Sequence, residues 1–305
     1  MINIYYRTIK DSRIRRLRSI RRGSWINVID PSEREIKFLK RQKIDINFIE
    51  DALDPDELPR IEKAGGETYI ILNSPFVSEN GKVLSIPLLV LITKDAMFTI
   101  CKNHLDWLKL ILKKQDIYTT KKTKNLIQIC IQITELYGKE IRRINKEIGK
   151  RKGALSSPEN KDIIALVELE ETLNEFITPL VSIIGVLEKI LTGKYMPIFS
   201  SDEDLLEDLI IDANQGLDMC KTSIKKIVNI REAYSTILSN SLNKVMKILA
   251  FLTLIMGVSN IIAGFYGMNV SLPIQENPIA FFYLVSLSLI LSLILILIFY
   301  FKKWI

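Results

Sequence analysis

The sequence carries almost no charge in its last 65 residues. Of its 42 basic and 35 acidic side chains, five lie there, at Lys244, Lys247, Glu276, Lys302 and Lys303. Because 48% of all residues are hydrophobic, this uneven distribution excludes a chain that is soluble throughout. Intrinsic disorder is excluded as well, because it requires low hydrophobicity together with high net charge.

Histidine and cysteine are scarce. The single histidine, His104, excludes a histidine-cluster metal site, and the three cysteines (Cys101, Cys130 and Cys220) form no C-x-x-C pair. We therefore expect buried thiols in a reducing compartment, with no disulfide or zinc framework. The sequence has no G-x-G-x-x-G fingerprint, and residues 149–153 lack the spacing of a phosphate-binding loop. These absences predict a protein that is not an enzyme and has no organic cofactor.

Two long uncharged runs occupy the C-terminal end. Residues 248–266 and 279–301 contain no charged side chain, and about 20 apolar residues suffice to cross a hydrocarbon core of roughly 30 Å. We expect two transmembrane helices joined by an external loop, 267–278. Lysines precede the first run and follow the second, so the positive-inside rule places both termini, including the basic tail 302–305, in the cytoplasm.

The first 24 residues are rich in arginine and contain one acid, Asp11. The basic side chains are Arg7, Lys10, Arg13, Arg15, Arg16, Arg18, Arg21 and Arg22. A solvated cytosolic face is the simplest interpretation, and a transit peptide is an alternative. No aromatic platform or recognition motif accompanies these residues, so we expect no nucleic-acid partner.

Residues 25–101 alternate between helical and strand patterns, which predicts a cytosolic α/β domain that we place at 1–118. We expect helices near 31–43 and 47–53 and strands near 25–29, 68–72, 87–92 and 97–100. Residues 119–200 are mostly helical and predict a cytosolic helical hairpin region.

A proline-free stretch covers residues 198–272. Apolar residues recur there at gaps of four and three, which predicts a long helix packed on partner helices. We interpret 201–247 as a stalk helix that continues into the first span. Stalk and span together, from Asp202 to Phe265, would form a helix about 96 Å long.

Apart from Met246, one face of the first span carries small or polar residues. Its members are Asn243, Met246, Ala250, Thr253, Gly257, Asn260 and Gly264; we call this set the seam. Small residues allow close helix packing, but an amide in mid-membrane is costly without water or an ion, so Asn260 favours an aqueous path. One two-span chain cannot enclose a pore, and a lining role therefore requires a ring of identical subunits.

The sequence Tyr266-Gly267-Met268-Asn269 ends the first span. Together with residues 262–264, 243–247 and 302–304, it resembles the CorA family of magnesium transporters. Trp25, Pro31, Asp54 and residues 59–62 of the N-terminal half are similar to the cytosolic domain of that family.

The resemblance implies a homopentameric funnel with an α/β domain, a stalk helix and a pore lined by five first spans. Gly267, Met268 and Asn269 correspond to the selectivity filter, where amide oxygens receive hydrated Mg²⁺. Met246 and Leu249 correspond to a hydrophobic gate that closes by dewetting, with Asn243 forming a narrow ring below. Glu276 would attract cations at the outer mouth.

The resemblance also implies a regulatory Mg²⁺ bound between subunits, with Asp208 as its ligand on the stalk helix and Asp204 and Asp212 nearby. Acids in a first helical turn also complement the helix dipole, so this cluster has a structural alternative. The sequence departs from many relatives in having no proline in mid-span.

These observations predict a passive Mg²⁺ channel of the cell membrane that is driven by the membrane potential. Co²⁺ and Ni²⁺ are further candidate permeant ions. Its partners are then membrane lipid, divalent cations and further copies of the chain. A ZntB-like Zn²⁺ transporter of the same fold is the first alternative, although the pore lacks the ligands that zinc prefers. A membrane-anchored coiled-coil scaffold is the second, and it leaves the seam unexplained.

Overall fold

The computed structural model describes residues 1–78, 81–113, 117–153, 160–274 and 277–302. The chain divides into two compact units, Met1–Asn229 and Ile230–Ile305. The strands are β1 (Ile2–Tyr6), β2 (Arg15–Leu17), β3 (Ser24–Ile29), β4 (Arg60–Ala64), β5 (Glu67–Val77), β6 (Val83–Ile92) and β7 (Ala96–Cys101). The helices are α1 (Glu33–Arg41), α2 (Ile46–Leu53), α3 (Asp106–Lys113), α4 (Lys122–Gly153), α5 (Asn160–Leu191), α6 (Ser200–Tyr266) and α7 (Ala280–Phe301).

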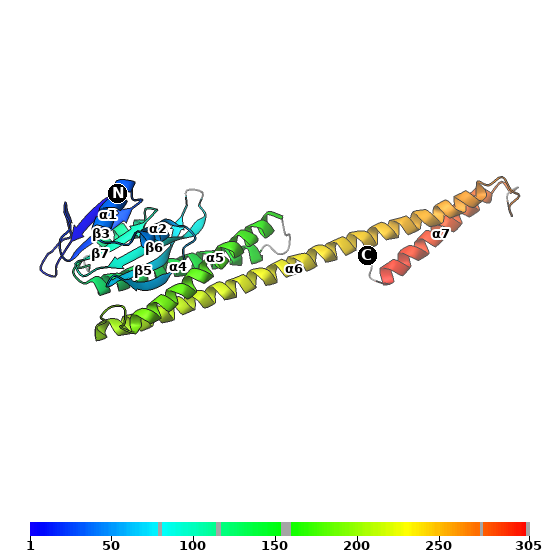
Figure 1. Cartoon of the computed structure of the whole chain (residues 1–305). Helices are drawn as coiled ribbons and strands as arrows, with labels where there is room; N and C mark the ends of the chain where they lie inside the picture. Colours follow the sequence, from blue (N-terminus) through cyan, green and yellow to red (C-terminus); the bar gives the residue numbers. More distant parts are fainter. Residues whose placement is uncertain (79–80, 114–116, 154–159, 275–276, 303–305) are drawn as a thin grey trace. The chain divides into compact units, whose positions relative to one another are not determined.

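The first unit contains one mixed sheet in the order β2-β1-β3-β7-β6-β5-β4 (Figure 1). Among the strands of the described residues, β3 and β7 pair in parallel, with Trp25 opposite Met97, and the other neighbouring strands are antiparallel. Strands β5 and β6 pair as neighbouring antiparallel strands, with Ile70 opposite Val90, and β6 pairs with β7 in the same way. The α/β class expected from the sequence is confirmed.

Helices cover both faces of this sheet. On one face, α1 and α2 contribute Leu39, Phe48 and Ile49 to an apolar core with Ile71 and Leu89 of the strands. On the other, α4 and α5 contact β5 and β6. Since both faces are buried, the central strands are continuous apolar runs without the alternation of a half-exposed sheet.

The helices of the first unit interlock with the sheet through buried polar contacts. The Trp107 Nε1–H of α3 donates to Ser74 Oγ of β5 at 2.9 Å. The fully buried Tyr137 of α4 places its hydroxyl 2.6 Å from Ser85 Oγ of β6. These contacts fix the positions of α3 and α4 against the strands.

We expect Tyr137→Phe to lower the free energy of unfolding by about 1–2 kcal/mol, because it leaves Ser85 and the Asn73 carbonyl without their buried partner. That hydroxyl also donates to the Asn73 carbonyl oxygen at 3.2 Å. Thermal unfolding of the purified chain measures the change. The control is Tyr6→Phe, which keeps the ring under the guanidinium of Arg21; an equal loss in both variants would contradict the assignment.

The sequence patterns predicted no strand in the arginine-rich residues 1–24, but this segment contains β1 and β2. Both the short edge strand β2 and the opposite edge strand β4 are missed by the sequence patterns. Edge strands are often short and charged, which protects them from pairing with other chains and also removes the apolar alternation that predicts a strand.

The long helix α6 runs without a break from Ser200 to Tyr266. Within the first unit, Ala213, Leu217, Cys220 and Ile227 are buried, as the spacing of four and three predicts. A Cβ atom on Gly216 would lie 3.9 Å from Ile141 of α4 and 4.0 Å from Leu180 of α5. The first part of α6 therefore packs on both preceding helices.

Candidate functional site: a membrane hairpin and an acidic groove

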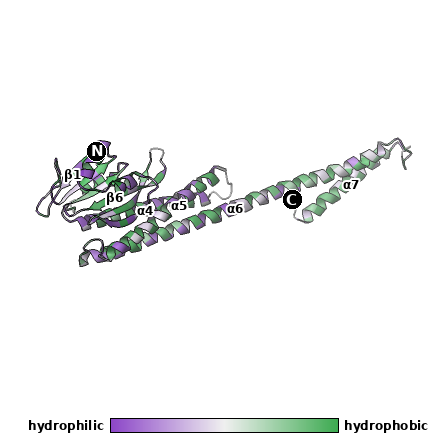
Figure 2. Cartoon of the chain, in the orientation of Figure 1, coloured by the Kyte–Doolittle hydropathy of each residue, from purple (hydrophilic) through white to green (hydrophobic). Residues whose placement is uncertain are grey.

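The second unit contains two helices long and apolar enough to cross a membrane, the end of α6 and α7. Figure 2 shows hydrophobic residues along nearly all of α7. The two helices pack as an antiparallel hairpin. Ser259 Oγ lies 2.9 Å from Ser288 Oγ, and the rings of Phe251 and Phe299 have centroids 5.0 Å apart.

The hairpin turns one face of α6 toward α7 and leaves another uncovered. The side facing α7 is partly buried and includes Phe251, Ile255, Ser259, Ile262 and Tyr266. Six seam residues are exposed, namely Asn243, Met246, Ala250, Thr253, Asn260 and Gly264, whereas Gly257 is partly buried. Leu249 is also exposed. The seam is thus available to contact water or a further helix.

The triplet Gly267-Met268-Asn269 follows the last turn of α6. The Gly267 N–H donates to the Ala263 carbonyl at 2.9 Å, and a Cβ on Gly267 would lie 3.2 Å from that oxygen. Gly267 has no positive φ, so this close approach, and not a left-handed turn, favours glycine here.

The loop after the triplet is held by the end of the helix. The Tyr266 hydroxyl donates to the Pro273 carbonyl oxygen at 3.2 Å, and the side chain of Asn269 is exposed. Glu276, expected at the outer mouth, and Lys303 of the tail lie outside the described residues. Tyr266 was not among the expected site residues, although it directly precedes the triplet.

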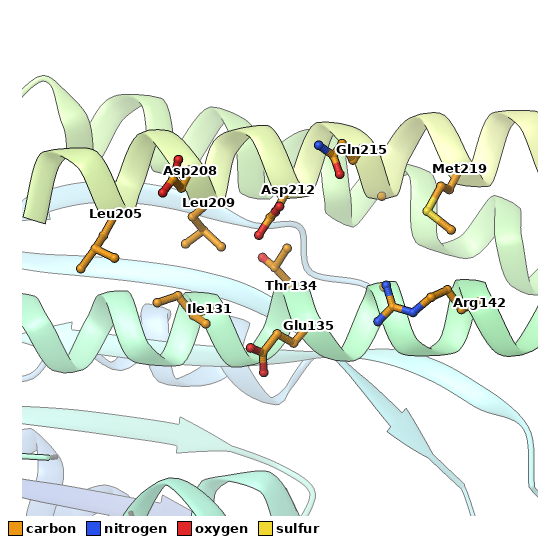
Figure 3. A pocket seen from close by; sticks show the side chains of 12 residues that line it. Ile131, Thr134, Glu135, Arg142, Leu205, Asp208, Leu209, Asp212, Gln215 and Met219 are labelled. Carbon is orange, nitrogen blue, oxygen red and sulfur yellow. The ribbon is translucent and has the colours of Figure 1, made fainter.

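The expected regulatory acids lie in the first unit, on the first turns of α6. Asp204, Asp208 and Asp212 are all exposed. Asp208 and Asp212 line a cavity of about 300 Å³ between α6 and α4, together with Glu135 and Arg142 of α4 (Figure 3). No sequence pattern indicated that α4 faces these acids, because Glu135 and Asp212 are 77 residues apart in the chain.

The groove mixes charges and lacks a preformed metal site. Arg142 lies back over Gly138, where an added Cβ would come within 3.2 Å of Arg142 Nη1. Among the residues that the structure describes, no three His, Cys, Asp or Glu side chains gather closely enough to hold a metal ion. A divalent ion at Asp208 would therefore need retained water or ligands from another chain.

The cysteines have the character expected from the sequence. Cys101, Cys130 and Cys220 are free and buried. Burial raises the pKa of each of these thiols to about 12, so they stay protonated at neutral pH. Because the thiolate is the reactive form, they act as small apolar side chains.

The α/β unit, the long helix and the apolar hairpin with its uncovered polar seam are the features of a membrane protein with two candidate spans. The CorA-like Mg²⁺ transporter protein family has a model that matches residues 22–303. The chain belongs to this family, which confirms the resemblance based on the Gly-Met-Asn triplet.

Known proteins of this family resemble the chain along nearly its whole length. The Cobalt/magnesium transport protein CorA of Methanocaldococcus jannaschii is 28% identical over 294 residues, covering 92% of this chain and 91% of that protein. The complete structure of the CorA magnesium transporter from that organism matches with a TM-score of 0.88 and 25% identity, covering 100% of this chain and 99% of that one.

A more distant structure shares only the fold. The ZntB cytoplasmic domain from Vibrio parahaemolyticus matches at 9% identity with a TM-score of 0.65, covering 78% of this chain and 98% of that domain.

Proposed function

We propose that this chain assembles as a homopentamer that conducts Mg²⁺ passively into the cell through a pore lined by five copies of α6. The observation that carries the proposal is the seam, which is exposed on the side of α6 away from α7 and leads to Gly267-Met268-Asn269. Five such faces around one axis enclose an aqueous path, which one hairpin cannot do.

The driving force is sufficient without nucleotide hydrolysis. A divalent ion that crosses 100 mV inward gains about 4.6 kcal/mol, from ~2.3 kcal/mol per charge. The lysines before the first span and after the second support cytoplasmic termini by the positive-inside rule. Ions therefore meet Asn269 first, then the gate at Met246, and Asn243 last.

Amide chemistry in the filter suits a hydrated ion. Mg²⁺ gives up its waters reluctantly, so neutral amide oxygens of Asn269 can accept hydrogen bonds from the hydration shell and leave the ion mobile. The exposed Asn269 side chain is free for this role. The related archaeal protein is a cobalt/magnesium transporter by name, which supports Co²⁺ as a second permeant ion.

The inner end of the seam supplies the gate. Met246 and Leu249 are both exposed on α6, at 58% and 64% of their surface. In a five-fold ring, these side chains form an apolar constriction that excludes water when closed. Asn243, one turn earlier, supplies a polar ring at the cytoplasmic entrance.

We expect Asn260→Leu to reduce Mg²⁺ uptake by about tenfold or more, because an apolar ring in mid-span removes a hydrogen-bonding step for the hydrated ion. Uptake into proteoliposomes measures the effect. The matched control is Ser259→Ala, which removes a polar group from the neighbouring position that faces Ser288. Equal losses in both variants would show that the seam has no special role.

The proposed function as a whole is tested by flux of Mg²⁺, Co²⁺ and Zn²⁺ into proteoliposomes, with and without a pH gradient. We expect Mg²⁺ flux that follows the membrane potential and ignores the pH gradient. Absence of flux for every ion would contradict transport. Proton-dependent Zn²⁺ flux would favour a ZntB-like function, for which the shared fold is the supporting observation.

A further inference from the structure

The arginine-rich segment at the N-terminus belongs to the α/β unit and not to α6, which lines the proposed pore. Arg16 of strand β2 and Arg18, the residue after that strand, line a pocket of about 650 Å³ together with Arg34 of helix α1. The floor of this pocket is apolar and consists of Ile2, Ile4, Leu17 and Phe38. Basic groups from two separate elements thus surround one apolar hollow.

The three arginines are available to a ligand. Arg16 Nη2 donates to the side-chain oxygen of Asn3, which is 7% exposed, so the Arg16 head is held in place. Within the described ranges, neither Arg18 nor Arg34 has an ion pair or a side-chain hydrogen bond, and both are exposed. Two guanidinium groups therefore retain all their donors.

The one acid at the pocket is already occupied by hydrogen bonds. Glu35 Oε2 accepts from the Ser32 N–H at 2.9 Å and from the Ser32 hydroxyl at 3.0 Å. This reciprocal capping arrangement starts helix α1 and directs the Glu35 charge toward the helix N-terminus. The remaining charge at the pocket is strongly positive.

We propose that this pocket binds a nucleoside polyphosphate. Guanidinium groups pair with phosphate oxygens in a bidentate manner, and three of them match a chain of phosphates better than a single carboxylate. The apolar floor then suits the planar base. A cavity of about 650 Å³ is within the usual range for small-molecule sites, roughly 300–1,000 Å³.

The test is calorimetric titration of ATP into the detergent-purified full chain, in EDTA and at an ionic strength of about 0.15 M to screen nonspecific attraction. We expect saturable binding that Arg18→Gln/Arg34→Gln weakens by about tenfold or more, since charge-assisted contacts to phosphate are lost. The matched control is Lys10→Gln/Arg13→Gln, which removes two exposed charges from the same segment outside the pocket. We expect it to bind as the unmodified chain does.

Titration of inorganic triphosphate tests the contribution of the phosphate chain separately from that of the nucleoside. We expect it to bind more weakly than ATP, because it leaves the apolar floor uncovered. Equal affinities would overturn the nucleoside part of the proposal. No ATP binding, or equal weakening in both double variants, would overturn the site itself, and neither result bears on ion flux.

Discussion

Asn269→Ala is expected to lower Mg²⁺ uptake by about 100-fold or more, because a ring of five methyl groups cannot accept hydrogen bonds from the hydration shell of the ion. The substitution leaves α6 intact, since Asn269 lies beyond its last residue, Tyr266. Uptake into proteoliposomes at fixed potential gives the measurement. Size-exclusion chromatography establishes that the oligomer still assembles.

The control for Asn269 is another amide of the same external loop. The Asn277 side-chain oxygen accepts from the Ile279 N–H at 2.9 Å, and Asn277→Ser preserves that contact. We expect Asn277→Ser to transport Mg²⁺ at nearly the normal rate. Normal uptake by Asn269→Ala would remove Asn269 from the filter.

Asp208→Ala is expected to raise, by about tenfold or more, the internal Mg²⁺ concentration at which uptake is half inhibited. A tenfold change corresponds to a coupling free energy of ~1.4 kcal/mol between ion binding and closure. We propose that, in the pentamer, an ion at Asp208 would bridge two subunits that separate on opening and would thereby stabilise the closed state. Flux measured at a series of internal Mg²⁺ concentrations gives the half-inhibiting value.

The groove in Figure 3 suggests how to control this experiment. Asp208 and Asp212 lie one turn apart and line the cavity opposite Glu135. Asp218, an exposed acid of the same helix, is not among the residues that line it. Asp218→Ala removes an equal charge and should leave the Mg²⁺ response unchanged. An unaltered response in Asp208→Ala would exclude this acid from regulation.

The two candidate spans could be predicted from the sequence, because the surrounding lipid constrains their composition. A hydrocarbon core tolerates few charges, so the two spans are visible as uncharged runs of the necessary length. The seam could be assigned to one face because helical periodicity alone decides which residues of α6 share a side. The Gly-Met-Asn triplet at its end then indicated the family, which the comparison with the family model confirms.

The strands at the N-terminus show where local patterns fail. Arg15 and Arg16 of β2 pair with Tyr6 and Tyr5 of β1 through backbone hydrogen bonds, which depend little on side-chain polarity. A charged edge strand therefore has no apolar signature. The arginine pocket could not be predicted from local patterns either. Arg34 belongs to helix α1, and its approach to Arg16 and Arg18 depends on the tertiary fold.

The sequence by itself determined the membrane hairpin, the α/β class and the long proline-free helix, because each depends on composition or on a short period along the chain. Only the tertiary structure decided that α7 covers the Ser259 side of α6 and leaves Asn260 exposed. It also placed Glu135 opposite Asp212. Both results depend on contacts between elements distant in sequence, where packing of whole faces, and not local preference, selects the neighbour.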